Sequence, residues 1–386
     1  MSIACRISLA LLVGLLATES GAAILRVGPG EEFERIADAA RAAQDGDTVE
    51  IMPGEYSGDV TVWKQKKLLI RGAGQRPVLV SSGKTAEGKA IWVIRNGDIR
   101  VENIEFRGAR ANSGNGAGIR LERGHLEVRN CVFMDNQTGI LTSNFEDATL
   151  TVRDSVFAQA PHQEHSHPHL LYVGRIARFE LSGSRFHQGY RGHLVKTRAR
   201  YNDIRYNLLY DGPLGEASYE LEFPNGGVAF VIGNIIGQSA NTQNPVVVAY
   251  GAEGRSWSEN SLYLSHNTLL SDRLTGTWFL RTFTDRLPPD TEIIGINNIT
   301  VGIGAFTLSA SGYFHGNIPL PPGGLRNPET LDFRPYGASL LRKITSPAGM
   351  ARGLPLAPEA EFSLPLGTRP LGPPQHWLPG ALQGDD

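Results

Sequence analysis

The chain has 386 residues and a formal net charge of −2, so no pervasive basic field is present and nothing in the composition predicts a nucleic-acid partner. Length alone permits two domains, but repeat proteins routinely exceed the usual size of one domain. Glycine is abundant, at 45 residues, without the three-residue period of collagen. These values leave a glycine-rich repeat fold as the first class to test.

The first 23 residues have the pattern of a secretory signal peptide. Arg6 precedes an apolar run from Leu9 to Leu16, and small residues follow at positions 21 to 23. This run is too short to cross a bilayer, so we expect cleavage after residue 22 or 23 and a secreted or periplasmic protein without a membrane span. The mature chain would then keep one cysteine, Cys131, and no intramolecular disulfide.

An amphipathic segment precedes the first long series of strands. Residues 31–43, EEFERIADAARAA, place Phe33, Ile36, Ala37 and Ala40 on one helical face. A turn and a strand follow in DGDTVEIMPGEY. Because the open end of a stack of strands presents unpaired edges, we expect this helix to cap the first coil.

From residue 99 onward a repeat is visible, in which a short strand ends in a buried apolar residue. The end of the unit recurs every 23 to 33 residues, at Phe106, Phe133, Phe157, Phe186, Leu209, Ile236, Leu269 and Ile299. A second strand follows each polar turn, as in HLVKT and YELEF. Short strands on a coil-sized period without intervening helices predict a right-handed parallel β-helix over residues 24–317. Antiparallel sandwiches are the alternative, but hairpin signals such as Asn-Gly are scarce.

The slot two residues before the end of each unit predicts an internal ladder. This slot holds Ile104, Cys131, Ser155 and Ser184, and then Asn207, Asn234, Asn267 and Asn297. Stacked asparagine side chains hydrogen-bond to the coils above and below them. Surface turns rich in asparagine explain the residue type but not its fixed offset from a buried apolar residue.

Residues 318–386 differ in composition from the repeat. Thirteen of the 23 prolines lie there, which is typical of disordered segments. However, Leu331, Phe333, Phe362 and Trp377 are apolar residues that require burial. We therefore expect a Pro-rich tail that wraps back over the β-helix and closes its last coil.

The segment VGPGEEFERIADAARAAQDGDTVEIMPGEY, residues 27–56, resembles the opening of pectate-lyase-like right-handed β-helices, and the Asn-containing coils are similar to the same superfamily. The resemblance implies an all-β, single-stranded parallel β-helix with an N-terminal capping helix. The superfamily includes lyases, hydrolases, epimerases, esterases and phage adhesins. The reaction must therefore be argued from the site.

Titratable groups of both signs concentrate between Pro161 and Gly227. Six of the ten histidines lie between His162 and His193, and a basic run and an acidic pair follow. The basic run is Arg191, Lys196, Arg198 and Arg200, and the acidic pair is Glu220 and Glu222. Such clustering is a signature of functional sites.

Counting back from the buried end of each coil predicts how the second strands align. His193 falls beside Glu220 and Val195 beside Glu222. Strict alternation turns both glutamates outward on one face, roughly 6.5 to 7 Å apart. It also turns Lys196 inward, unless a bulge or the end of the strand directs it outward.

A first hypothesis for this face is β-elimination from a uronate-containing polysaccharide. A base removes the proton alpha to the sugar carboxyl while a cation neutralises that carboxyl. Lys196, crowded by Arg198 and Arg200, is the candidate base, and His193 or Tyr219 the acid. The segment GHLVKTRARYNDIRYNLL resembles the lysine-bearing coil of alginate and chondroitin lyases, which implies the same role for Lys196. In that family an arginine follows one coil later, and acidic residues bind calcium. Here the next coil offers Glu220, Glu222 and Asn225 instead of an arginine. Arg198 or Arg175 would then take the role of the arginine.

Three other hypotheses remain open. Glu220 and Glu222 have a spacing that suits an inverting glycoside hydrolase. His165, His167 and His169 would share a face in an extended strand and suit zinc. A polysaccharide-binding module without catalysis is the third.

The sequence thus predicts a monomeric carbohydrate-active enzyme that acts on a polysaccharide, with calcium as the possible metal. The candidate catalytic residues are Lys196, Arg198, His193, Glu220 and Glu222. The candidate substrate-binding residues are His169, Tyr172, Arg175, Tyr219, Asn225 and Tyr250, and Glu253 extends the same groove. Glu220 and Glu222 are also the candidate calcium ligands.

Overall fold

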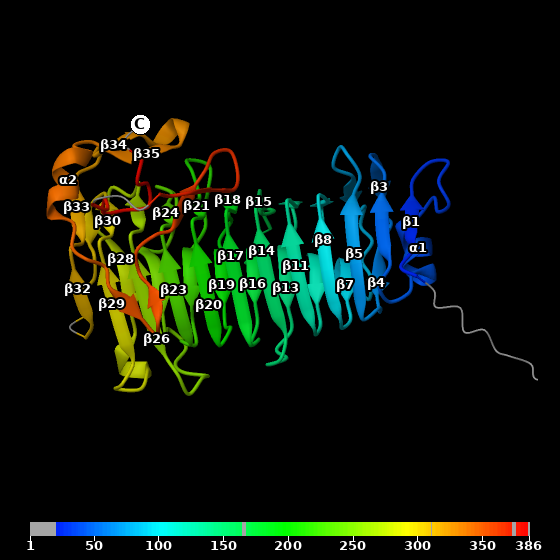
Figure 1. The fold of residues 1–386 in the computed structure, drawn as a ribbon, viewed down its shortest axis with the longest axis horizontal. Helices are drawn as coiled ribbons and strands as arrows, with labels where there is room; N and C mark the ends of the chain where they lie inside the picture. Colours follow the sequence, from blue (N-terminus) through cyan, green and yellow to red (C-terminus); the bar gives the residue numbers. More distant parts are fainter. Residues whose placement is uncertain (1–20, 164–166, 310, 373–375, 385–386) are drawn as a thin grey trace, which may run out of the picture.

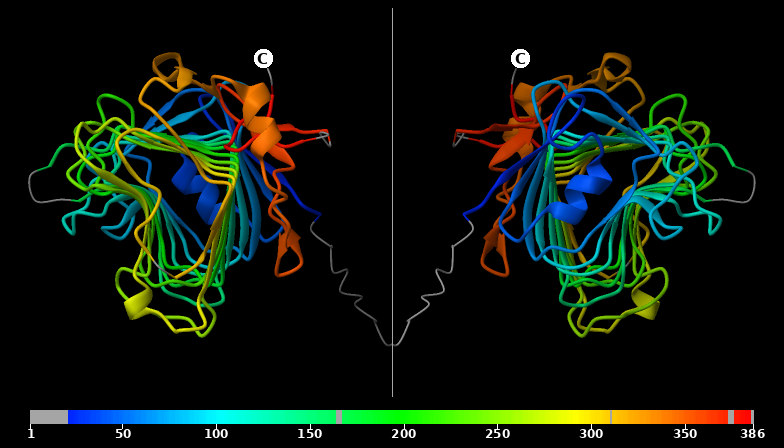
Figure 2. Two further views of the ribbon diagram at one scale, coloured as in Figure 1. Left: turned by 90° about the vertical axis from the view of Figure 1, so that its left-hand side faces the viewer. Right: turned by 90° about the vertical axis from the view of Figure 1, so that its right-hand side faces the viewer.

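The computed structural model describes residues 21–163, 167–309, 311–372 and 376–384, which form a solenoid of about ten turns (Figure 1). Parallel strands of successive coils stack into three long sheets, which surround the interior when the molecule is viewed end-on (Figure 2). The prediction of an all-β, right-handed parallel β-helix is confirmed. The proposed signal peptide lies almost entirely outside the described residues.

Each full coil gives one strand to each sheet. Sheet A contains β1 (Ile24–Val27), β2 (Thr48–Ile51), β5 (Lys67–Gly72), β8 (Asp98–Glu102), β11 (His125–Arg129), β14 (Thr149–Arg153), β17 (Arg178–Ser182), β20 (Tyr201–Arg205), β23 (Val228–Ile232), β26 (Ser261–Ser265), β29 (Glu292–Ile296) and β32 (Tyr313–His315). Sheet B contains β3 (Glu55–Ser57), β6 (Val78–Val80), β9 (Glu105–Arg107), β12 (Val132–Met134), β15 (Val156–Ala158), β18 (Arg185–His187), β21 (Leu208–Tyr210), β24 (Ile235–Gln238), β27 (Thr268–Ser271), β30 (Ile299–Val301) and β33 (Ile318–Leu320). Sheet C contains β4 (Thr61–Trp63), β7 (Ala90–Ile94), β10 (Ala117–Leu121), β13 (Thr138–Thr142), β16 (His169–Val173), β19 (His193–Thr197), β22 (Tyr219–Phe223), β25 (Val246–Tyr250), β28 (Thr277–Thr282) and β31 (Gly304–Ala305).

The interior is filled by columns of identical or similar side chains. Phe106, Phe133, Phe157 and Phe186 stack nearly parallel, with ring centroids 4.6 to 5.1 Å apart. All four are buried, as the period of the repeat predicts. Stacked aromatic pairs stabilise by about 0.5 to 1.5 kcal/mol beyond the area that they bury.

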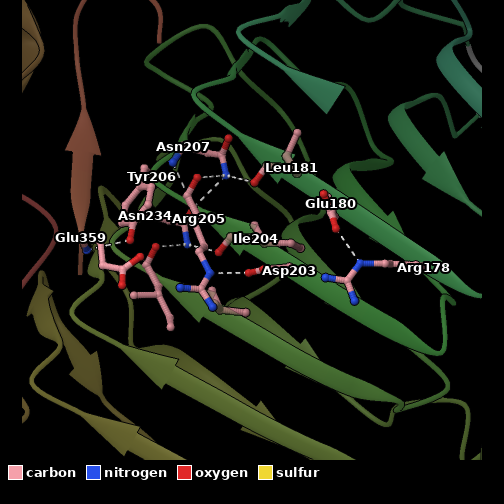
Figure 3. Close-up of polar contacts among 12 residues, drawn as sticks. Arg178, Glu180, Leu181, Asp203, Ile204, Arg205, Tyr206, Asn207, Asn234 and Glu359 are labelled. Atoms are coloured by element: carbon pink, nitrogen blue, oxygen red, sulfur yellow. Dashed lines mark hydrogen bonds and ion pairs between the residues drawn. The ribbon is translucent and has the colours of Figure 1, made fainter. Parts of the chain in front are cut away.

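The asparagine ladder lies at the turn from sheet A to sheet B. Asn207, Asn234 and Asn267 are fully buried. The side-chain oxygens of Asn234 and Asn267 each accept both the backbone and the side-chain N–H of the preceding asparagine, and that of Asn207 accepts the backbone N–H of Ser184. The Nδ2 of Asn234 also donates to the carbonyl of Ile204, 2.8 Å away (Figure 3). Burying these amides costs little because their hydrogen bonds are made.

One rung of the predicted ladder was wrong. Asn298 and then Asn317 continue the ladder, whereas Asn297 bonds to the carbonyl of Ser346 in the C-terminal segment. The reason is register: Leu269 pairs with Thr300, so the buried end of that coil is Thr300 rather than Ile299.

The N-terminal helix α1 (Ile36–Ala42) lies across the first end of the solenoid (Figure 2). It starts five residues later than predicted, because Phe33 makes a bridge to Val27 in place of a helical turn. The buried carboxylate of Asp59 accepts the first backbone N–H groups, those of Ile36 at 2.6 Å and Ala37 at 3.1 Å. This carboxylate satisfies two of the unpaired donors at the helix start.

The segment after β33 packs back on the solenoid (Figure 1). Its elements are β34 (Leu325–Asn327), β35 (Asp332–Pro335), α2 (Ala338–Ile344), β36 (Met350–Ala351), β37 (Leu354–Pro355), β38 (Ala360–Phe362) and β39 (Thr368–Pro370), with a 3-10 turn at Pro328–Thr330; another such turn lies at Thr284–Arg286. Phe333, Leu341 and Phe362 bury apolar side chains of sheet B, and Leu356 those of sheet A. The backbone N–H of Glu359 donates to the hydroxyl of Tyr206 at 2.8 Å (Figure 3).

The apolar clusters that hold this segment thus involve sheets A and B. Within the described residues, neither of these clusters includes a side chain of sheet C. Among the described residues, no helix is both long enough and apolar enough to cross a membrane.

Candidate functional site

The strands in the middle of sheet C depart from simple alternation. Leu194 and Val195, consecutive in β19, both belong to the apolar core. Between β19 and β22, His193 pairs with Tyr219 and Lys196 with Glu222. Two consecutive inward residues therefore turn the next one outward, so Lys196 lies on the outer face of the sheet.

The alignment predicted from the sequence was wrong by one residue. It placed Val195 beside Glu222, whereas Val195 pairs with Leu221 in the core. Tyr172, Lys196 and Glu222 instead form one outward column across three coils. Their backbones are about 4.8 Å apart from one strand to the next.

Lys196 is held between two carboxylates. Its Nζ lies 3.2 Å from Glu222 Oε2 and 3.3 Å from Glu253 Oε1. The Lys196 side chain is only 12 % exposed, and that of Glu222 5 %, so this ion pair is largely shielded from solvent. The sequence predicted that Lys196 is crowded by arginines, but its contacting charged partners in the structure are carboxylates.

Arg198 follows β19 and contacts the same loop carboxylate. Its Nη1 and Nη2 lie 2.7 and 3.0 Å from the two oxygens of Glu253, a bidentate pair. The guanidinium also donates to the hydroxyl of Tyr172 at 3.0 Å and to the side-chain oxygen of Asn225. Arg198 and Lys196 thus converge on one carboxylate at the surface.

Two histidines stack beside this cluster. The rings of His169 and His193 are 4.7 Å apart and nearly parallel. The backbone N–H of His193 donates to His169 Nδ1 at 3.0 Å, which makes that nitrogen an acceptor. The His193 Nδ1, also 3.0 Å away, must then carry the hydrogen. His193 Nε2 is left with its lone pair, 3.4 Å from Glu222 Oε2.

Burial and charge shift the ionisation of this cluster. Burial, reinforced by Lys196, lowers the pKa of His169 to about 3. Burial, with His169 and Lys196 nearby, holds the pKa of His193 well below its usual value. Burial raises the pKa of Glu222 in spite of Lys196, whereas the hydrogen bond from Arg198 lowers the pKa of Glu253. Both imidazoles are therefore neutral at pH 7, and of the two carboxyls that contact Lys196, Glu222 takes a proton more readily than Glu253.

Glu220 does not belong to the outer face. It occupies the position of Leu194 in the next strand, is fully buried, and neither of its carboxyl oxygens has a hydrogen-bond partner among the described residues. Burial and the nearby Asp211 hold its pKa well above the usual value, so it is a neutral acid in the core. Glu220 and Glu222 therefore lie on opposite sides of sheet C. The paired arrangement expected for a hydrolase or a shared calcium site is not the one found.

Two of the six predicted substrate-binding residues lie away from the cluster. Tyr250 pairs with Phe223 on the inward side and is fully buried, with its hydroxyl donating to the carbonyl of Gly227. Arg175 pairs with Glu146 and stacks on Trp257 at the border of the face. The other four, His169, Tyr172, Tyr219 and Asn225, contact the cluster directly.

The histidine segment before β16 is only partly described. His165, one of three candidate zinc ligands, lies outside the described residues. Within the described part of the chain, no group of three or more histidine, cysteine or acidic side chains is placed to hold a metal.

The loop after β25 supplies residues of the site whose contacts the sequence did not predict. Glu253 was expected only to extend the groove, yet it contacts Lys196 and Arg198 from 57 and 55 residues away. Trp257 was not named at all; its indole donates to the carbonyl of Arg198 at 3.0 Å and stacks with Arg200. A charged and aromatic loop between two apolar strands was the available signal.

Solved structures resemble this fold over most of its length. The crystal structure of pectate lyase Pel9A has a TM-score of 0.54 at 14% identity, covering 94% of this chain and 97% of that one. An alginate lyase from Paenibacillus sp. str. FPU-7 has a TM-score of 0.50 at 12% identity, covering 77% of this chain and 99% of that one. No protein-family model matches the sequence, and the comparison with curated proteins gave no match. The chain has the pectate-lyase-like parallel β-helix fold, as the resemblance in its opening segment predicted.

Proposed function

We propose that this protein is a polysaccharide lyase that cleaves a uronate-containing polysaccharide by β-elimination on the outer face of sheet C. One observation carries the proposal: Lys196 and Arg198 converge on the carboxylate of Glu253. Glu253 is 46 % exposed and comes from a loop, so a substrate carboxylate can replace it. The lyase neighbours, which share only the fold, are consistent with this choice.

In the proposed complex, the sugar carboxylate takes the place of Glu253 against Arg198. A bidentate guanidinium neutralises the carboxylate and stabilises the negative charge that develops on it when the alpha proton leaves. Lys196 Nζ lies 3.3 Å from the nearer Glu253 oxygen, which puts it within reach of a proton on the carbon next to the carboxyl group. Arg198 thus supplies the role that the family assigns to an arginine one coil later.

Lys196 must lose a proton before it can act as the base, and we propose that Glu222 accepts that proton. Its carboxylate contacts Lys196 at 3.2 Å, and its raised pKa makes it the acceptor for the lysine proton. The amine then takes the alpha proton, the C–O bond to the leaving sugar breaks, and a carbon–carbon double bond forms. The leaving oxygen takes a proton from the hydroxyl of Tyr219, whose ring lies 5.0 Å from that of His193; His193, neutral and with its proton on Nδ1, has none to give.

The same face offers a path for a long polysaccharide. Arg281 continues the column of Glu222 two coils on, and it stacks between Trp278 and Phe283 with its charge 4.5 to 4.8 Å from their rings. A chain that follows the solenoid axis from Lys196 reaches this arginine after about 14 Å. A second carboxylate of the substrate would bind there. We also propose export, on the apolar N-terminal run.

Incubation with alginate, pectate, glycosaminoglycans and bacterial exopolysaccharides tests the proposal. Elimination gives an unsaturated product that absorbs at about 235 nm, and Lys196→Ala should not form it. Binding of an acidic polysaccharide without any product, in wild-type protein, would instead identify a binding module. If the wild-type protein neither bound nor cleaved any of these acidic polymers, the proposal would be contradicted.

A further inference from the structure

A second polar cleft lies away from sheet C, where the C-terminal segment ends on sheet B. It has a volume of about 700 Å³ and is bordered by strands β18 and β21 on one side and by residues 328–331 on the other. From Leu208 onward the outward column of sheet B is covered and, apart from Thr268, apolar, as at Ile235. Arg185 is the last residue of that column before the cover begins.

Arg185 is a half-buried cation on the wall of this cleft. No carboxylate among the described residues pairs with it, and burial is the only influence on its pKa, which is lowered. By contrast, Arg107, on the same outer face three coils away, pairs with Glu105. Charged groups that are partly removed from water are ordinarily paired, so an unpaired arginine in a cleft predicts an anionic ligand.

The rest of the cleft lining carries acceptors and apolar surface. Tyr210 donates its hydroxyl to Asp272 at 3.1 Å, and Glu329 lies nearby in the 3-10 turn. Leu331 ends that turn with φ 65°, a backbone conformation that leucine rarely adopts. Carboxylate acceptors with leucine and tyrosine surfaces suit the hydroxyls and C–H faces of a sugar.

We propose that this cleft is a second binding site for an acidic saccharide, with the uronate carboxylate on Arg185 and sugar hydroxyls on Asp272 and Glu329. The site is separate from the reaction on sheet C and does not depend on it. It would hold the polysaccharide or its product on another face of the solenoid. The test must distinguish this saccharide site from two alternatives. One is an anion site without sugar selectivity, and the other is nonspecific binding to the surface.

The test is titration of 15N-arginine-labelled protein with D-galacturonate, D-glucuronate and D-mannuronate, followed at the Nε–H signals. Monosaccharides have no glycosidic bond to cleave, so wild-type protein can be used. We expect at least one uronate to shift the Arg185 signal saturably, whereas D-galactose and acetate at equal concentration should not. The Arg107 signal, the matched control, should stay in place.

Arg185→Gln should weaken uronate binding at this site at least tenfold, while Arg107→Gln should leave it unchanged. No shift of the Arg185 signal with any of the three uronates would overturn the proposal. If acetate shifted the Arg185 signal as much as the uronates do, the cleft would be a general anion site. If the uronates shifted the Arg107 signal as much as the Arg185 signal, they would be binding nonspecifically to the surface. Either result contradicts a saccharide site. The Arg198 signal reports separately on sheet C, so failure of one site is distinguishable from failure of the other.

Discussion

The asparagine ladder and the sheet C cluster bury polar groups in opposite ways. In the ladder, Asn207, Asn234 and Asn267 repeat one residue type at one slot, and every rung hydrogen-bonds to its neighbours. In the cluster, Tyr172, Lys196 and Glu222 occupy one column with three different residues, and Lys196 pairs both with Glu222 in the column and with Glu253 of a distant loop.

The contrast separates structural from functional polar residues in a solenoid. A side chain that recurs in every coil is explained by the stacking that it satisfies. A column whose residues change from coil to coil gains no stacking, and burying its charges costs free energy. The predictions below test this division, beginning with the largest expected effect.

Replacing Lys196 should affect activity far more than stability. Lys196→Ala removes the proposed base, whose proton transfer occurs only in the transition state, so kcat should fall by about 10²- to 10⁴-fold. The measurement is the rate of unsaturated product from the best acidic substrate. The control is Arg178→Ala, which removes a cation paired with Glu180 on sheet A (Figure 3). Comparable activity in the two variants would exclude Lys196 as the base.

Replacing a ladder rung should do the reverse. Asn234→Leu leaves the neighbouring amide and carbonyl groups without their buried partner and should lower the free energy of unfolding by roughly 1 to 3 kcal/mol. Urea unfolding measures this loss. Asn241→Leu is the control, because the exposed side chain of Asn241 makes one hydrogen bond among the described residues, to the carbonyl of Pro213. Equal stability of both variants would show that the ladder contributes little.

The same division explains what could be predicted from the sequence. The recurrence of Phe106, Phe133, Phe157 and Phe186 at one position of their short strands was enough for the fold, because stacking in the interior fixes that position while the length of the coils varies. The misplaced rung at Asn297 arose because two asparagines and two candidate ends, Ile299 and Thr300, are adjacent, so a one-residue shift leaves the pattern intact.

The site could be predicted only in part. Lys196, Arg198, His193 and Glu222 do lie together, since strand order alone brings their coils into contact. Glu220 was placed on the wrong side, because an acidic residue in a run of alternating residues gives no sign that two consecutive positions face inward. The contact from Glu253 depends on how a loop folds over the sheet, which no strand period encodes.

The stacked histidines should make stability depend on pH. The folded-state pKa of His169, about 3, lies below its usual value, so this neutral ring stabilises the fold above pH 6.5 and the contribution is lost as the pH falls. Lowering the pH from 7 to 5 should cost about 1 to 2 kcal/mol through His169, and His169→Asn should remove that part of the loss. Thermal unfolding at both pH values measures it, with the exposed His125→Asn as control. An unchanged pH profile in His169→Asn would contradict the buried neutral ring.

Removing Glu253 should have the smallest effect. Glu253→Ala frees Arg198 and Lys196 from a partly exposed ion pair of about 0 to 1 kcal/mol, so the KM for an acidic polysaccharide should fall by a few fold. The kcat should change little, since Glu253 takes no part in the proton transfers. Steady-state kinetics with Glu259→Ala as a loop control measure this. A rise in KM would show instead that Glu253 binds the substrate.

The central claim, that this face uses a substrate carboxylate for elimination, is tested most directly by removing that carboxylate from the polymer. Wild-type protein is incubated with the acidic polysaccharide that it cleaves and with its carboxyl-reduced form, and new reducing ends and the absorbance at about 235 nm are measured together. We predict that both signals rise with the acidic polymer and that neither rises with the reduced one. New reducing ends from the reduced polymer, without the absorbing product, would contradict the account and indicate hydrolysis.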